Sequence, residues 1–287
     1  MESTEGQDDA RVVELRDEHL AGCLALSKSA HWNQNEADWR LMLAQGRGWG
    51  VMLGGALAAS TVVLPYGNTF AWVSMVLVLP ELRRKGFATQ LLKKVLIENS
   101  RSGLASILDA TPAGHEVYVQ EGFRDTWGFK RFALSSSSRE AVSSKEARPI
   151  EKADWRGILE LDAPAFGASR EAVLRNLAAR LPDAALVADR GGKIAGFVLG
   201  RDGREARQLG PLVARDEKTA TGLLNAALAG ARPPVYMDIA NHAPALQDWA
   251  LARGFAFQRP FTRMVIGVPR APGDESLVYC PAGPELG

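Results

Sequence analysis

Cysteine is scarce in this sequence, and neither sign of charge prevails. Cys23 and Cys280 are the only cysteines among 287 residues; they lie far apart, and no metal-ligand set surrounds either. This predicts two reduced thiols in a cytosolic setting and no metal site. Lys and Arg number 34 against 33 Asp and Glu, which leaves a net charge of +1. Such a small charge gives no reason to expect nucleic acid or a membrane surface as a partner.

Long apolar runs are lacking too, and we expect no signal peptide. No apolar stretch is long enough to cross a bilayer, and the acidic, polar opening MESTEGQDDAR is unlike a signal peptide. Hydrophobic residues make up 46% and charged residues 23%, as in globular proteins. The length suits one large domain or two of ordinary size. We expect a cytoplasmic protein whose residues 1–10 are disordered.

The same order of elements occurs twice, on either side of a stretch rich in serine and charge. Residues 135–147 have few large apolar groups, as a linker does. Each flank predicts a strand, two helices and a hairpin with a Gly-Gly turn. Before the linker these are 12–15, 18–29, 36–44 and Gly54-Gly55; after it they are 149–150, 154–165, 170–180 and Gly191-Gly192.

The second half of each flank also agrees. Pro112 stands ten residues before Gly122, and Pro244 stands ten residues before Gly254. This shared register indicates an internal repeat, with a coincidence of Gly and Pro positions as the alternative. The tail has one strand-like run, 276–280, which either docks on a sheet or stays loose. The predicted boundaries are 11–134 for the first domain, 135–147 for the linker, 148–270 for the second domain and 271–287 for the tail.

One helix start lacks a carboxylate. The apolar run Trp72–Leu79 predicts a strand buried on both faces, and apolar spacing predicts a helix from Gly86. The loop between them holds Arg83, Arg84 and Lys85. The first turn of a helix has unpaired N–H groups and the positive end of the dipole, so it ordinarily attracts Asp or Glu. Three cations there predict that a ligand's phosphates take the carboxylate's place, held by backbone N–H groups.

This loop is not a P-loop, because no Gly-Lys-Ser/Thr is present. It resembles the acetyl-CoA pyrophosphate loop of the GCN5-related N-acetyltransferase (GNAT) superfamily. A downstream segment is similar to the Tyr-x-x-x-Gly-Phe segment of that family. Both motifs fall within residues 10–134, whereas 147–268 resembles the family in element order alone. The matching residues are Val78-x-Pro80-x-x-Arg83-x-x-Gly86-x-Ala88 and Tyr118-x-x-x-Gly122-Phe123.

The resemblance implies an α/β fold in which each of two tandem domains is a mixed, mostly antiparallel sheet flanked by helices. Strands four and five would splay apart, and acetyl-CoA, the co-substrate, would lie in that cleft without any metal. Its pantetheine would run along strand four like an added strand. The residues implied to contact acetyl-CoA are Leu77, Val78, Leu79, Arg83, Arg84, Lys85, Gly86, Phe87, Ala88, Thr89 and Tyr118.

The chemistry implied by the resemblance is direct attack of an amine on the thioester within a ternary complex. The backbone N–H of Val78 would stabilise the charge that develops on the carbonyl oxygen. Tyr118 matches the general acid of the family. A phenol, with a pKa of about 10, needs a nearby charge or hydrogen bond to protonate a thiolate. The other interpretation of Tyr118 is a ring that packs on the cleft wall.

A general base is lacking on strand four, where many relatives carry Glu and this chain has no acid. The base is then either a water chain or a side chain from elsewhere. Segment 30–39 corresponds to the acceptor pocket of the family, so Glu36 and His31 are the candidates, with His115 a further one. Glu36 could instead begin a helix after Asn33, and a lone His is often structural. The residues implied to line the acceptor site are His31, Trp32, Asn33, Glu36, Trp72 and Ser74.

The second domain departs from the pattern at the positions that would carry chemistry. Two acids, Asp216 and Glu217, stand in the counterpart of the basic loop, and Ala250 takes the place of Tyr118. We predict a degenerate copy that binds no acetyl-CoA. A shifted loop in which Gly222 and Lys218 bind the phosphates is the alternative.

Taken with the resemblance, these features predict an acyltransferase whose first domain transfers acetyl from acetyl-CoA to a primary amine. A small metabolite is favoured over a protein as the acceptor, because no acidic groove for basic peptides is evident in the sequence. We expect a monomer or homodimer with no nucleic-acid or membrane partner. A non-catalytic acyl-CoA-binding sensor or scaffold with two such folds is the alternative, which the missing acid on strand four leaves open.

Overall fold

The structure, a computed structural model, describes residues 10–136 and 147–287. The stretch 1–10, expected to be disordered, and the expected linker 135–147 lie almost wholly outside the described residues. The chain divides into two compact units, Met1–Ser106 and Ile107–Gly287. The sequence repeats, 11–134 and 148–270, are named the first and second repeat from here on, and their bounds stay a prediction.

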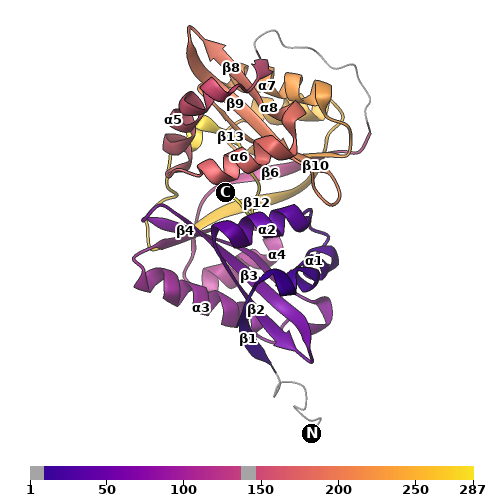
Figure 1. Ribbon diagram of the computed structural model, residues 1–287, viewed down its shortest axis with the longest axis vertical. Coiled ribbons are helices and arrows are strands. Elements are labelled where there is room, and N and C mark those ends of the chain that lie inside the picture. Colours follow the sequence, from indigo (N-terminus) through magenta and orange to yellow (C-terminus); the bar gives the residue numbers. More distant parts are fainter. Residues whose placement is uncertain (1–9, 137–146) are drawn as a thin grey trace. The chain divides into compact units, whose positions relative to one another are not determined.

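The described elements follow one another in the same order in both repeats (Figure 1). Those of the first repeat are β1 (Arg11–Glu14), α1 (Leu20–Ser29), α2 (Glu36–Gln45), β2 (Arg47–Leu53), β3 (Ala56–Tyr66), β4 (Phe70–Val78), α3 (Phe87–Arg101), β5 (Ala105–Ala110), α4 (Pro112–Gln120) and β6 (Arg124–Leu134). Those that follow are β7 (Ala147–Pro149), α5 (Trp155–Phe166), α6 (Glu171–Arg180), β8 (Leu186–Arg190), β9 (Lys193–Arg201), β10 (Arg207–Ala214), α7 (Glu217–Gly230), β11 (Val235–Ala240), α8 (Pro244–Ala252), β12 (Ala256–Ile266) and β13 (Val278–Cys280).

Both predicted rounds of strand, helix, helix and hairpin are confirmed, and so is the mixed sheet flanked by helices. The first helix starts later than expected, because Asp17–His19 form a 3-10 turn before α1. Most strand pairs are antiparallel, whereas β10 and β11 are parallel. The described residues therefore have the fold class that the sequence predicts.

In the first compact unit, helices cover both faces of the sheet β1–β2–β3–β4. Successive residues of a strand point to opposite faces, so the two sides of β2 meet different helices. On one side Gly48 lies against Leu43 of α2, and α2 in turn contacts α1. On the other side Val51 packs with Phe87 and Leu91 of α3. The start of α3 is thereby held close to the end of β4.

In the second compact unit, the last strands of the two repeats change places. β6, from the first repeat, lies between β11 and β12, and β12 lies between β5 and β6. β6 and β12 are antiparallel, and Phe129 opposite Phe261 brings their rings to a stacked separation of 5.0 Å. These two residues are equivalent in the repeat, so the two strands pair through matching positions.

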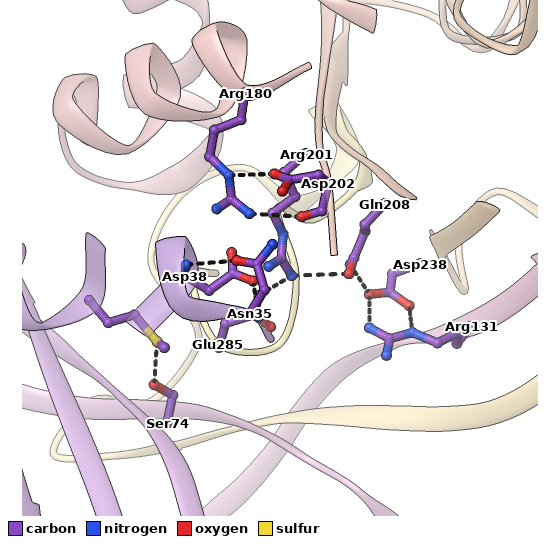
Figure 2. Close-up of polar contacts among 11 residues, drawn as sticks. Asn35, Asp38, Ser74, Arg131, Arg180, Arg201, Asp202, Gln208, Asp238 and Glu285 are labelled. Carbon is purple, nitrogen blue, oxygen red and sulfur yellow. Dashed lines mark hydrogen bonds and ion pairs between the residues drawn. The ribbon is translucent and has the colours of Figure 1, made fainter. Parts of the chain in front are cut away.

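Two buried ion pairs stabilise this exchange of strands. Arg131 of β6 donates two hydrogen bonds of 2.7 Å to Asp238 of β11 (Figure 2). Arg263 of β12 donates hydrogen bonds of 2.9 and 3.0 Å to Asp109 of β5. The two arginines are again equivalent positions of the repeat. All four side chains are buried, so removal of one partner would leave an uncompensated charge in the interior.

The predicted tail docks on the sheet of the second compact unit, which was one of the two alternatives that the sequence left open. β13 pairs antiparallel with β10, with Cys280 opposite Leu212 and Val278 opposite Val213. The strand is shorter than the expected run 276–280, because Glu275–Leu277 form a 3-10 turn capped by the side chain of Asp274.

Candidate active site

β4 ends with the backbone groups of Val78 turned away from β3. The next residue, Leu79, donates its N–H to the carbonyl of Ala58 on β3, at 3.0 Å. Successive N–H groups point to opposite edges of a strand, so the N–H of Val78 faces the other way. The Val78 carbonyl, on that same edge, accepts from Nε of Arg83 at 3.4 Å. This direction suits the oxyanion donor that the resemblance implies.

A bulge in the middle of β4 precedes this residue. Met75 has a φ of 51°, and the register with β3 shifts between Ser60 and Val62. The Ser60 hydroxyl donates to the Met75 carbonyl at 2.8 Å. A non-glycine residue with positive φ costs about 1 kcal/mol or more and is often found at functional sites. Sequence reasoning missed this bulge, because Met has no preference for the left-handed region.

The loop after β4 turns through two left-handed residues, Arg84 (φ 62°) and Gly86 (φ 87°). α3 begins at Phe87 with Gly86 as its N-cap, and no side chain caps it. Within the described chain, no backbone N–H from 84 to 89 donates to a backbone carbonyl, and that of Gln90 is the first that does. A run of unbonded N–H groups at a helix start is a site for an anion.

Three cations border this amide run. Arg83, Arg84 and Lys85 are exposed, and no ion pair among the described residues engages them. A Cβ placed on Gly86 would meet no atom of the chain within 4 Å, so the space in front of the loop is open. The donor groups and the charge therefore fit the phosphates of acetyl-CoA.

The polar segment predicted to line the acceptor site does begin a helix, but with a different cap. The side chain of Asn35 accepts from the N–H of Asp38 at 3.2 Å, and Asp38 accepts from the N–H of Asn35 at 2.9 Å (Figure 2). The expected cap of Asn33 with Glu36 is wrong by two residues, because Asn35 is the residue with extended backbone angles. Glu36 instead pairs with Arg40 one turn later, at 2.9 Å.

His31 and Trp32 lie in the turn that follows α1. Their N–H groups donate back to the carbonyls of Lys28 and Ser27, and His31 has a φ of 53°. The His31 side chain is exposed, and its ring makes no hydrogen bond or ion pair with any described residue. Asn33, in contrast, is buried. His31 is thus the more available of the two predicted base candidates, since Glu36 is already paired.

Two further residues of the predicted acceptor site, Trp72 and Ser74, are buried. They project from alternate positions of β4 and are 1% and 6% exposed. The Ser74 hydroxyl lies 4.0 Å from the Met42 sulfur (Figure 2). Their role toward an acceptor stays a prediction.

Tyr118 lies on α4, in the second compact unit. Its ring meets Phe123 edge-on, with centroids 5.9 Å apart, and packs over Gly114 of its own helix. Burial raises the pKa of the phenol to about 12. No hydrogen bond or ion pair from a described residue reaches its hydroxyl, so the described residues do not supply the assistance that a general acid needs. His115, one turn earlier, pairs with Asp125 at 2.8 Å.

The counterpart of the basic loop in the second repeat is closed by its own carboxylates. Asp216 is the N-cap of α7 and accepts from the N–H of Thr219 at 2.8 Å. Glu217 accepts from the N–H of Leu246, in the first turn of α8, at 3.1 Å. The connection from β10 is short, because α7 already begins at Glu217.

Ala250 occupies the place of Tyr118, as the sequence spacing predicts. Phe255 donates its N–H to the Ala250 carbonyl at 3.1 Å, just as Phe123 donates to the Tyr118 carbonyl at 3.0 Å. The methyl group of Ala250 is buried and carries no proton for a thiolate. The second repeat thus lacks both the amide run and the phenol.

Models of known families match both repeats. A model described as acetyltransferase (GNAT) family matches residues 12–123, and one described as acetyltransferase (GNAT) domain matches residues 158–280. With the fold and the loop geometry, these matches place the chain in the GNAT superfamily, with two such domains in tandem. The protein is an acyltransferase. Enzymes of this family use acetyl-CoA and act on amine acceptors.

Individual relatives share this arrangement at low identity. The uncharacterized N-acetyltransferase YitH of Bacillus subtilis (strain 168) is 23% identical over 247 residues, which cover 85% of this chain and 87% of that protein. A putative acetyltransferase from Pyrococcus horikoshii superposes with a TM-score of 0.81 at 18% identity, over 98% of this chain and 96% of its own. A tandem GNAT protein from the clavulanic acid biosynthesis pathway gives 0.61 at 16% identity, over 90% and 98%.

The described residues contain neither a membrane-spanning helix nor a metal-binding cluster of side chains. None of their helices combines the length and the apolar character needed to cross a bilayer. Nor do three or more of their His, Cys, Asp or Glu side chains come together in a way that would hold a metal ion.

Proposed function

We propose that the first repeat transfers an acetyl group from acetyl-CoA to a primary amine of a small molecule, by direct attack within a ternary complex. The observation that carries this proposal is the start of α3: among the described residues, the N–H groups from 84 to 89 reach no backbone carbonyl, no side chain caps the helix, and no ion pair engages the three cations before it. Acetyl-CoA, when bound, supplies the activated acetyl thioester. The near-neutral charge of the chain favours a small acceptor over a basic protein.

The residues of β4 and those of the loop after it have different roles. The N–H groups from 84 to 89 bind the pyrophosphate, and Arg83, Arg84 and Lys85 neutralise its charge. The N–H of Val78 stabilises negative charge as it develops on the thioester oxygen. The N–H groups are part of the backbone, so they need little reorganisation when negative charge develops on the thioester oxygen.

The amine must lose a proton before or during attack. Of the predicted bases, Glu36 is engaged with Arg40, whereas the His31 ring has no partner among the described residues. We assign the base role to His31, directly or through water, because its imidazole is exposed and can accept a proton from the amine. Tyr118 is the proposed donor to the departing thiolate.

The test is consumption of acetyl-CoA by the pure full chain across a panel of small amines and one basic peptide. Turnover with small amines is expected, and Gly86→Glu should weaken acetyl-CoA binding at least about tenfold, or about 1.4 kcal/mol, through repulsion at the amide run. Gly55→Glu is the matched control, since Gly55 also has a positive φ (81°) and an open surround.

Two outcomes would contradict the proposal. Unchanged calorimetric affinity of a folded Gly86→Glu variant would show that the phosphates do not bind at this loop. Tight binding of acetyl-CoA without turnover of any amine would instead favour a sensor or scaffold.

A further inference from the structure

β10 is the counterpart of β4, and one of its edges is shared by two partners. β9 holds the opposite edge from Gln208 to Ala214. On the shared edge, Arg207–Leu209 pairs in parallel with β11, whereas Leu212 and Val213 pair with β13. The register shifts between these two stretches. β13 therefore lies in the gap that opens where β11 diverges from β10.

Buried cations anchor the segment that follows β13. Arg201 of β9 forms an ion pair with Glu285, and Arg170 donates to the backbone oxygen of Gly287 (Figure 2 shows the first pair). Arg201 and Glu285 are 0% and 1% exposed. Arg201 also donates to Gln208 of β10 at 3.1 Å, which ties the anchor to the strand. The segment is bound by charge as well as by strand pairing.

Glycines make room for the backbone of this segment. A Cβ on Gly210 of β10 would overlap the carbonyl oxygen of Pro281, and one on Gly273 would overlap the carbonyl of Ala165 on α5. Cys280 and Ala282 are fully buried against this surface. The segment packs so closely on β10 that any side chain at Gly210 would force the segment away.

We propose that residues 278–287 occupy the place in the second repeat where an acyl-CoA would bind, and that they thereby exclude this ligand. They hold the edge of β10 that corresponds to the edge of β4 where Val78 turns outward. A ligand that adds to a strand needs that edge unpaired. At each of the nearby helix starts a carboxylate accepts from one backbone N–H: Asp216 from Thr219 of α7, and Glu217 from Leu246 of α8. This inference rests on the proposed function in one respect only: the proposed function names acyl-CoA as the ligand that the segment excludes.

Cys280 reports on docking of the segment, and Cys23, equally buried in the first compact unit, is the matched reference. The native full chain is treated with N-ethylmaleimide, and each cysteine peptide is quantified by mass spectrometry. We expect both thiols to react only through opening of the fold, and saturating acetyl-CoA to change the Cys280 rate by less than about twofold.

Gly210→Ala is expected to release the segment and to speed labelling of Cys280 about a hundredfold, with Cys23 unchanged. Gly192→Ala is the control, because Gly192 also has a positive φ (77°) but faces open space. Should Gly210→Ala fail to fold by circular dichroism, Glu285→Gln replaces it. That variant weakens the buried pair with Arg201 and should speed Cys280 labelling about tenfold.

The proposal is overturned if acetyl-CoA speeds Cys280 labelling in the wild type more than about tenfold, because a ligand would then displace the segment. It is overturned equally if Cys280 stays protected in folded Gly210→Ala and in Glu285→Gln. Failure of the first repeat to bind acetyl-CoA would leave the response to both substitutions unaffected, so the two proposals fail separately.

Discussion

Tyr118 holds its proton more tightly than a tyrosine in water. Because burial raises its pKa to about 12, the phenol is fully protonated at neutral pH and can donate a hydrogen bond. Release of the proton is harder for the same reason. A departing thiolate, whose thiol has a pKa of about 8.5, would take this proton only if the bound co-substrate stabilises the phenolate that forms.

Tyr118→Phe keeps the ring contacts with Phe123 and Gly114 and removes only the hydroxyl. If the phenol is the acid, kcat should fall about a hundredfold while acetyl-CoA affinity stays the same. The pH profile of kcat between 6 and 10 should keep its shape, since Tyr118 does not titrate in that range. Steady-state and single-turnover kinetics give both numbers. An unchanged kcat in a variant whose chemical step limits turnover would leave Tyr118 a packing residue.

The starts of α3 and α7 are equivalent elements with opposite ways of satisfying their N–H groups. The N-cap of α3 is Gly86, which has no side chain to accept a hydrogen bond, and cations precede it. The N-cap of α7 is Asp216, whose carboxylate accepts from Thr219 and pairs with Arg190 at 3.0 Å. A helix start with its own carboxylate has no need of an external anion, which is the physical reason that the two repeats differ.

Asp216→Ala should therefore lower the free energy of unfolding of the second compact unit by about 1 kcal/mol, the usual value of an N-cap. Asp216→Asn is the control, because Asn caps equally well. The bond from Thr219 lowers the pKa of Asp216, so this stabilisation is present at neutral pH and is lost as the pH falls and the carboxyl is protonated. Urea unfolding at pH 7 measures it; an unchanged midpoint for Asp216→Ala would contradict the cap.

Across the whole molecule, sequence repeats and compact units do not coincide. The chain divides between Ser106 and Ile107, because β6 of the first repeat pairs with β11 and β12 rather than with β5. Phe132 of β6 accordingly belongs to the apolar core of the second compact unit. Each repeat thus depends on the other for a strand.

One acetyl-CoA per chain is the stoichiometry that this asymmetry predicts. In our proposals the amide run of the first repeat binds the ligand, while Asp216 caps the equivalent helix of the second repeat and residues 278–287 occupy the strand edge there. Calorimetric titration of the full chain should give a single site, and Gly86→Glu should remove it without revealing another. Two equivalents bound, or a residual site in the Gly86→Glu variant, would show that the second repeat is open.

Local pattern determined most of the elements and the anion-binding loop. Apolar runs and helical spacing located β4 and α3, and glycine pairs located both hairpins, because these features depend on hydrogen bonds between near neighbours. The resemblance carried by Arg83, Gly86 and Tyr118 then indicated the family. The N-cap of α2 was predicted two residues too early, at Asn33 instead of Asn35. Several polar residues in a row can each act as an N-cap, and the backbone angles decide which of them does.

The tertiary structure alone decided which strand edges meet. No pattern in β6 or β12 says that each pairs across the repeats, because a strand edge offers the same N–H and C=O groups to any partner. The bulge at Met75 and the place of β13 have the same origin: both depend on contacts with residues far along the chain. The sequence by itself therefore predicted which loop of the first repeat would bind acetyl-CoA, whereas only packing showed that β13 pairs with the edge of β10 in the second repeat.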